Sequence, residues 1–105
     1  MANLHGMMKI TSIKNIADDV YEMILEGEGA KYISAPGQFI NIKINDSLQP
    51  YLRRPMSISD YDDSHIVIVF KVVGEGTKIL KNKEIGSYLD CLIGLGNGFT
   101  ITYKL

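Results

Sequence analysis

Two neighbouring arginines and a nearby serine are the first residues in this sequence whose types and spacing could do chemistry. They lie in the stretch Arg53-Arg54-Pro55-Met56-Ser57. A guanidinium presents a rigid fork of N–H donors that matches phosphate oxygens, and a serine hydroxyl both donates and accepts hydrogen bonds. Side chains alternate along an extended strand, so one arginine can enter a groove while the other faces solvent or a partner. A pair of solvated surface charges is the plainer interpretation.

A glycine-rich passage, Gly74-Glu75-Gly76-Thr77, is the second candidate. It follows the most β-branched run of the chain, 65–73, and precedes a predicted short helix over 77–83. Glycines let a backbone approach a phosphate closely, and the start of a helix favours an anion. An ordinary turn capped by Thr77 explains the passage equally well. Together with an arginine, however, the passage indicates a site for a pyrophosphate.

The elements that must position these residues are mostly strands. The stretch 38–44 carries isoleucine at every second position from Ile40, which is the period of a half-buried strand. Further strands are predicted over 9–13, 20–25, 56–59, 65–73 and 88–93, with glycine-rich turns between them. Six short strands and one helix favour a closed or nearly closed antiparallel barrel, because closure removes exposed strand edges.

Length and composition agree with one folded domain. The chain has 105 residues, of which 46% are hydrophobic and 22% charged, and its net charge is -1. This charge argues against a surface for nucleic acid. The sequence has no apolar run of eighteen residues, so no membrane span is expected. It has one cysteine, which excludes a disulfide within the chain and favours a cytoplasmic protein. Residues 1–6 show no periodicity and are expected to be a flexible start or leader, with the domain over 7–105.

Other chemically suggestive residues carry weaker signals. Cys91 is expected to be a small buried thiol, because no basic residue lies beside it in the sequence. His5 and His65 are too far apart to indicate a metal site, and no catalytic residue or metal ligand is predicted. The aspartates at 60, 62 and 63 are expected to form a polar turn.

The order of the motifs resembles the ferredoxin reductase-like flavoproteins, and most closely the dihydroorotate dehydrogenase electron transfer subunits. The resemblance rests on four stretches that cover most of the chain: Ala35-Pro36-Gly37-Gln38-Phe39, Leu52-Arg53-Arg54-Pro55-Met56-Ser57-Ile58, Val72-Val73-Gly74-Glu75-Gly76-Thr77-Lys78-Ile79-Leu80 and Gly94-Leu95-Gly96-Asn97-Gly98-Phe99. It implies a six-stranded antiparallel Greek-key barrel that holds FAD.

The resemblance also implies roles for particular residues. The Arg-x-aromatic-Ser motif of the family falls on Arg54, Pro55, Met56 and Ser57, although methionine replaces the common tyrosine. Arg54 would bind the FAD pyrophosphate, Met56 would lie against the isoalloxazine or ribityl, and Ser57 would bond near the flavin N5 or O4 edge. The remaining cofactor-binding residues implied are Phe70, Lys71 and Val72, which would flank the cofactor, and Gly76 and Thr77, which would complete the phosphate site.

The resemblance implies an oxidoreductase component that passes electrons between a catalytic subunit or iron–sulfur centre and NAD, in pyrimidine biosynthesis if the dehydrogenase is the dihydroorotate enzyme. Members of the family continue into a NAD-binding domain and carry a cysteine cluster, so those sites are expected only outside this chain, and the chain alone is not expected to turn over NADH. Two alternatives stay open at this point. One is a related NAD(P)H:ferredoxin or sulfide-associated reductase, and the other is a non-catalytic small barrel that binds a peptide or nucleic acid.

Overall fold

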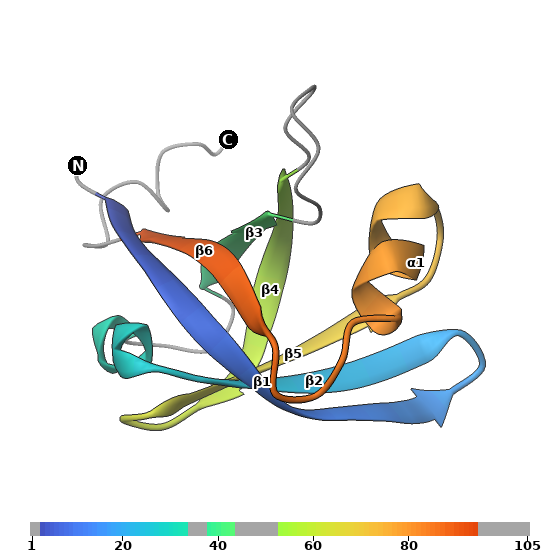
Figure 1. The fold of residues 1–105 in the computed structure, drawn as a ribbon, viewed down its shortest axis with the longest axis horizontal. Helices are drawn as coiled ribbons and strands as arrows, with labels where there is room; N and C mark the ends of the chain where they lie inside the picture. Colours follow the sequence, from blue (N-terminus) through green and yellow to red (C-terminus); the bar gives the residue numbers. More distant parts are fainter. Residues whose placement is uncertain (1–2, 34–37, 44–52, 95–105) are drawn as a thin grey trace.

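Six antiparallel strands close into a barrel in the computed structural model, which describes residues 3–33, 38–43 and 53–94 (Figure 1). The strands are β1 (Asn3–Ala17), β2 (Val20–Glu26), β3 (Phe39–Lys43), β4 (Arg53–Tyr61), β5 (His65–Lys71) and β6 (Tyr88–Gly94). Their order around the barrel is β1-β2-β5-β4-β3-β6. The predicted barrel with one short α-helix is therefore confirmed.

The core forms because each strand directs alternate side chains inward. On β5, for example, Ile66 and Ile68 are fully buried and Phe70 nearly so, while Val69 and Lys71 are exposed. Isoleucine dominates this interior, since its branched side chain suits the pleated wall of a barrel. The buried hydrophobic residues are Met8, Ile10, Met23, Leu25, Ala30, Ile33, Ile40, Ile42, Met56, Ile58, Ile66, Ile68, Phe70, Leu80, Leu89, Cys91 and Ile93.

Strand β1 closes the barrel and is much longer than the sequence predicts. Its second half pairs with β2, from Lys9↔Glu26 to Ala17↔Val20, and its first half pairs with β6, from Asn3↔Gly94 to Lys9↔Tyr88. The expectation of a start outside the fold is therefore wrong for residues 3–6. These residues show no hydrophobic periodicity from which a strand could be predicted. Their backbone partners lie on β6, more than eighty positions away in the sequence.

Two short helices lie at opposite ends of the barrel in Figure 1. The helix α1 (Glu75–Lys81) begins two residues before the predicted position, and Leu80 anchors it in the core. The 3₁₀ helix η1 (Glu28–Tyr32) was not predicted. Gly27 leads into η1, and a Cβ atom there would lie 2.6 Å from the Met8 sulfur, so only glycine fits this passage without repacking.

Strands β4 and β5 pair over only part of their lengths. Their ladder runs from Tyr61↔Ile66 to Ile58↔Ile68 and ends there among the described residues. On its other side, β4 continues to pair with β3 as far as Arg53, and β5 continues with β2 as far as Lys71. The barrel wall is therefore open between the start of β4 and the end of β5, next to α1.

Candidate functional site

A groove of about 600 Å³ occupies the opening between β4, β5 and α1. This volume lies within the usual range for small-molecule and cofactor sites. The groove is lined by Phe39, Arg54, Pro55, Met56, Ser57, Val69, Phe70, Lys71, Val73, Gly74, Gly76 and Thr77.

Eight of the nine cofactor-binding residues predicted from the sequence line this groove. The exception is Val72, which is half-buried, packs against the core, and donates its backbone N–H to the Asp19 carbonyl at 2.7 Å. Four lining residues were not in the predicted set: Phe39, Val69, Val73 and Gly74. Period-2 alternation on β3 and β5 puts Phe39 and Val69 on the outer face, which was the one available signal for them.

The backbone of β4 and β5 contributes a polar edge to the groove. The Ile58 N–H points away from it, since it donates to the Gln38 carbonyl at 2.8 Å. Peptide groups along a strand point to alternate sides, so the N–H and C=O of Ser57 are directed toward the groove. By the same alternation, the Val72 bond to Asp19 implies that the backbone groups of Lys71 and Val69 also point there. The last β4–β5 pair is Ile58↔Ile68, so toward Arg54 on β4 and Lys71 on β5 the two strands form no further pair among the described residues.

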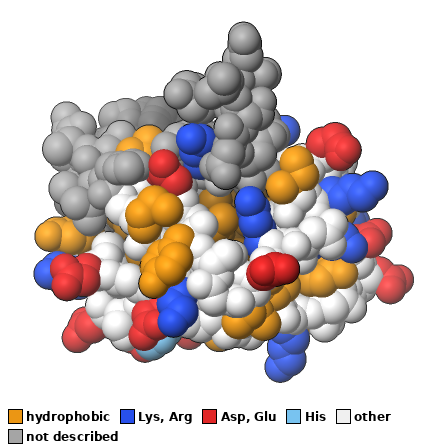
Figure 2. Space-filling view, viewed as in Figure 1, with side chains coloured by type: hydrophobic (Ala, Val, Ile, Leu, Met, Phe, Trp, Pro, Cys, Tyr) orange, Lys and Arg blue, Asp and Glu red, His pale blue; other side chains and the backbone are white. Residues whose placement is uncertain are grey.

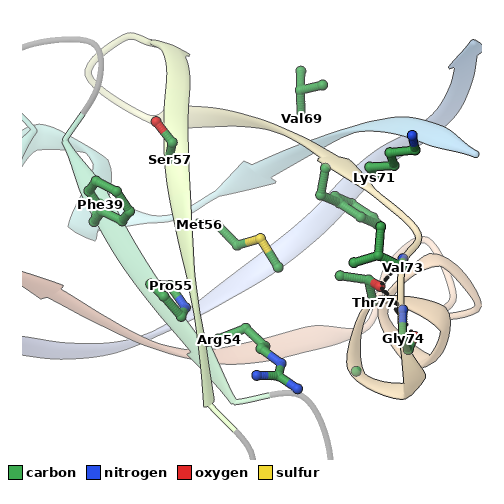
Figure 3. A pocket seen from close by; sticks show the side chains of 12 residues that line it. Phe39, Arg54, Pro55, Met56, Ser57, Val69, Lys71, Val73, Gly74 and Thr77 are labelled. Carbon is green, nitrogen blue, oxygen red and sulfur yellow. Dashed lines mark hydrogen bonds between the residues drawn. The ribbon is translucent and has the colours of Figure 1, made fainter.

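Arg54 supplies the positive charge at the α1 end of the groove. It follows the same alternation as Met56 and Ile58, so it leaves β4 on the core-facing side (Figure 3). Because the strand has reached the end of the barrel there, the guanidinium stays exposed and extends toward α1. Gly76 lies in the first turn of that helix, and the three heavy atoms nearest to the position of a Cβ on Gly76 are Nε, Cγ and Nη2 of Arg54.

The turn into α1 is held by the Thr77 side chain. Its Oγ1 accepts hydrogen bonds from the backbone N–H groups of Val73 at 3.0 Å and Gly74 at 3.3 Å (Figure 3). The same hydroxyl can donate to the Gly74 carbonyl, which lies 3.3 Å away. The hydroxyl therefore shapes the turn that borders the groove. Since α1 has only seven residues, we attribute the attraction for an anion to Arg54 and not to the helix dipole.

Apolar side chains form the floor and rim of the groove. Met56 and Phe70 are 7% and 5% exposed, and Phe70 stacks on Tyr21 with 6.1 Å between ring centroids. Lys81 on α1 places its Nζ 5.6 Å from the Tyr21 ring centroid, which links the helix to the wall behind the floor. By contrast, the rim residue Val73 is 76% exposed and Phe39 is 49% exposed. Such exposed apolar side chains around a cavity are typical of a ligand site.

The groove thus joins an apolar floor, a polar backbone edge and one guanidinium. This combination suits an elongated ligand that has a flat aromatic part with hydrogen-bonding edges and a phosphate at one end. Elsewhere on the described part of the face in Figure 2, acidic and basic side chains are interspersed. That distribution agrees with the net charge of -1 and does not resemble a surface for nucleic acid.

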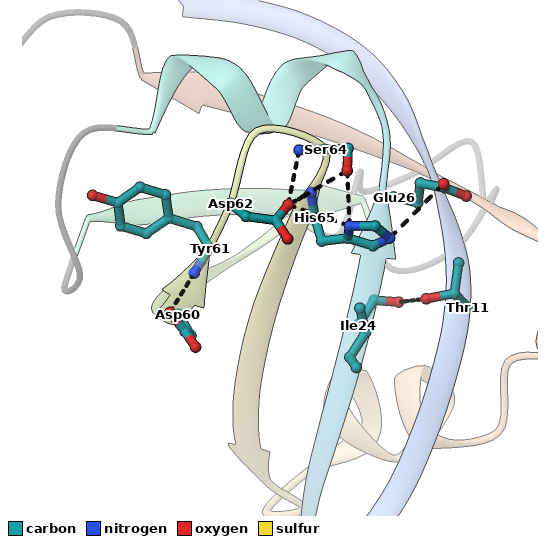
Figure 4. Close-up of polar contacts among 8 residues, drawn as sticks. All are labelled: Thr11, Ile24, Glu26, Asp60, Tyr61, Asp62, Ser64 and His65. Atoms are coloured by element: carbon teal, nitrogen blue, oxygen red, sulfur yellow. Dashed lines mark hydrogen bonds and ion pairs between the residues drawn. The ribbon is translucent and has the colours of Figure 1, made fainter.

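A second polar cluster lies at the β4–β5 hairpin, away from the groove (Figure 4). The Asp62 carboxylate accepts the backbone N–H groups of Ser64 at 2.9 Å and His65 at 2.7 Å, and lies 3.2 Å from His65 Nδ1. His65 Nε2 is 3.8 Å from a Glu26 oxygen. These bonds close the turn, and no group of three or more residues able to hold a metal occurs in the described part of the chain.

Parts of three sequence motifs lie outside the described residues, namely 35–37, Leu52 and 95–99. Within 3–33, 38–43 and 53–94, no helix is long and apolar enough to cross a membrane.

Comparison with known sequences supports the resemblance indicated by the motifs. No family model matches the chain. It is 38% identical over 96 residues to the dihydroorotate dehydrogenase B (NAD(+)) electron transfer subunit of Bacillus velezensis, a match that covers 90% of this chain and 38% of the relative. The subunit of the same name from Fusobacterium nucleatum is 41% identical over 88 residues, with 82% of this chain and 34% of the relative covered. The chain therefore spans little more than a third of these relatives.

Solved structures confirm the fold. The structure of an NADH-dependent reduced ferredoxin-NADP oxidoreductase that performs flavin-based electron bifurcation superposes with a TM-score of 0.72 at 27% identity, over 86% of this chain and 33% of the other. The FAD apo form of the ferredoxin reductase in carbazole 1,9a-dioxygenase gives a TM-score of 0.70 at 19% identity, over 90% and 30%. The six-stranded barrel of this chain therefore has the same fold as the barrels in these two reductase structures.

Replacing Thr77 with valine tests the turn at the groove. The change keeps the shape but removes the acceptor for two N–H groups, so the free energy of unfolding should fall by about 1–2 kcal/mol. Urea unfolding followed by circular dichroism measures this. Thr77→Ser keeps the hydroxyl and is the matched control. Equal stability of the valine variant and the unmodified chain would contradict the assigned capping role.

The hairpin predicts a particular dependence of stability on pH. Two backbone N–H bonds, from Ser64 and His65, hold the pKa of Asp62 below its ordinary value of 3.8. Just below pH 3.8 the native state therefore binds fewer protons than the unfolded state. The stabilisation that the Asp62 carboxylate gives the folded protein is complete above this pH and is lost as the pH falls through the lowered native pKa. Asp62→Ala should destabilise the protein at pH 7 and progressively less toward pH 2.

Denaturant unfolding across this pH range checks the prediction. Asp63→Ala, which removes the neighbouring exposed carboxylate, is the control and should show a weaker dependence on pH. If both substitutions give the same pH profile, the bonds of Asp62 do not stabilise the hairpin.

Proposed function

We propose that this chain holds FAD in the β4–β5 groove and serves as the flavin-binding barrel of an oxidoreductase component that transfers electrons. The observation that carries the proposal is the convergence of two separate sequence motifs on one groove. The Arg54–Ser57 stretch of β4 and the Gly74–Thr77 segment at the start of α1 come from different parts of the chain and face each other across it. Similarity to named electron transfer subunits over nine-tenths of the chain supports the same function.

The residues present fit a dinucleotide flavin. The groove has room for a large ring system over Met56 and Phe70. Among its described lining residues, Arg54 alone carries a guanidinium, and this group lies at one end, where it would contact a diphosphate but not a ring on the floor. The Ser57 hydroxyl and the backbone groups of the open strand edges supply donors and acceptors for a polar ring edge. An uncharged ligand would leave Arg54 without a role in the groove.

Each residue then has a distinct task. Arg54 would bind diphosphate oxygens with its forked donors, and Met56 would pack its polarizable sulfur against the ring. Ser57 would hydrogen-bond to the polar ring edge, while Phe70 and its stacking partner Tyr21 would exclude water from the buried side. Lys71 would place a positive charge beside the ring. When bound, FAD supplies the electron-accepting and electron-donating chemistry, and the protein supplies binding, orientation and electrostatics.

The electron partners follow from the relatives and belong to the proposal. We infer that the barrel passes electrons between a catalytic dihydroorotate dehydrogenase subunit, an iron–sulfur centre and NAD, with the last two groups held outside this chain. We also propose a cytoplasmic location, to which the single cysteine, a buried thiol, is suited. A related NADH-dependent ferredoxin reductase is the second candidate, but the identity to the Bacillus velezensis subunit, 38%, exceeds the 27% to that enzyme.

The chain should bind FAD more tightly than FMN, because Arg54 can reach both phosphates of a dinucleotide. Titration of the purified chain with each flavin, followed by quenching of flavin fluorescence, measures the two dissociation constants. Equal constants would argue against a diphosphate at Arg54.

Arg54→Ala should raise the dissociation constant of FAD about ten- to hundredfold, since a charge-assisted hydrogen bond contributes about 1.5–3 kcal/mol. Arg53→Ala removes the same charge one position away and should have a much smaller effect, because only Arg54 occupies the arginine position of the motif. A larger effect from Arg53→Ala would show that the motif had been placed in the wrong register.

A further inference from the structure

Gly76 lies in the first turn of α1 and has no backbone reason to be glycine. Among the described residues only Asp19 and Gly86 have positive φ angles, so Gly76 adopts a conformation open to any residue. Alanine is the better helix former, and glycine at such a position lowers stability. Some other constraint must therefore explain the missing side chain.

That constraint is the Arg54 side chain. A Cβ atom built on Gly76 would lie 3.0 Å from Arg54 Nε, 3.6 Å from Cγ and 3.7 Å from Nη2. Three atoms along the stem and guanidinium thus lie over the bare Cα of Gly76, which is buried beneath them. A methyl group there would make an unusually tight contact with the donor nitrogen, so the guanidinium would have to shift by a few tenths of an ångström.

Gly74, two residues earlier and also in the groove, has no such neighbour. A Cβ atom at Gly74 would meet nothing within 4 Å, and its φ of -171° is extended backbone that alanine adopts readily. The two glycines of the Gly-Glu-Gly-Thr turn therefore differ in what the protein itself requires of them.

We propose that Gly76 is a positioning residue for Arg54: because Gly76 has no side chain, the guanidinium can pack against α1 in the position from which it binds a diphosphate. Gly76 does not itself contact the phosphate. The inference rests on the proposed function of the groove as an FAD site. It assigns the selectivity for a dinucleotide flavin to a glycine–arginine pair that joins β4 to α1. Packing against the Gly76 Cα restricts the conformations of the arginine side chain before the ligand binds, which lowers the entropy lost on binding.

A double-substitution experiment separates this role from direct phosphate contact. The dissociation constants of FAD and FMN are measured for the unmodified chain, Gly76→Ala, Arg54→Ala and the double variant, with Gly6→Ala on β1, outside the groove and with nothing within 4 Å of the added Cβ, as the control. Gly76→Ala should weaken FAD binding about tenfold and reduce the preference for FAD over FMN. In the Arg54→Ala background the same change should have almost no effect, because the displaced group is gone.

Equal weakening by Gly76→Ala in both backgrounds would overturn the inference, since the methyl group would then obstruct the ligand itself. An unchanged FAD constant in Gly76→Ala would overturn it as well. Either result leaves the FAD site in place, as shown by binding to the unmodified chain, whereas absence of FAD binding to that chain would overturn the proposed function and this inference with it.

A measurement without flavin checks the seating directly. The ¹⁵N–¹H resonance of Arg54 Nε should shift in Gly76→Ala and stay in place in Gly74→Ala. Thermal unfolding should show that both alanine variants remain folded. An unmoved Arg54 resonance in Gly76→Ala would overturn the inference.

Discussion

The groove exists because β4 and β5 are hydrogen-bonded to each other over less of their length than either is to its outer neighbour. Their common ladder ends at Ile58↔Ile68, while β3 holds β4 as far as Arg53 and β2 holds β5 as far as Lys71. A closed barrel has no free edges. Opening it at one seam leaves the start of β4 and the end of β5 without β4–β5 pairs among the described residues, while β3 and β2 still hold these two segments.

This opening also explains how a charged residue can follow the core-facing pattern of a strand. Met56 and Ile58 fill the interior, and Arg54 continues their row at the point where the interior ends. A guanidinium farther along the strand would be buried at great expense. At the open seam its stem rests on α1 while its donors reach the groove, so the apolar floor and the positive charge are neighbours.

Helix α1 is fixed to the barrel on two sides, and the groove inherits that rigidity. Leu80 is fully buried, and Lys81 lies over the Tyr21 ring that stacks on Phe70. At the other end of the helix, Thr77 ties the incoming backbone through Val73 and Gly74. These contacts within the protein hold the walls of the groove in place before a ligand binds. The conformational entropy that the protein loses on binding is therefore small.

The sequence by itself determined the inward rows of isoleucine on β3 and β5 and the barrel class, because these depend on local alternation along single strands. The resemblance of its short motifs to a known family supplied eight residues of the groove. The early start of β1, the end of the β4–β5 ladder and the burial of Val72 against the core depend on partners remote in the chain. So does the contact of Arg54 with Gly76, because only the closed barrel brings the start of β4 and the first turn of α1 together, and no period in the sequence records that meeting.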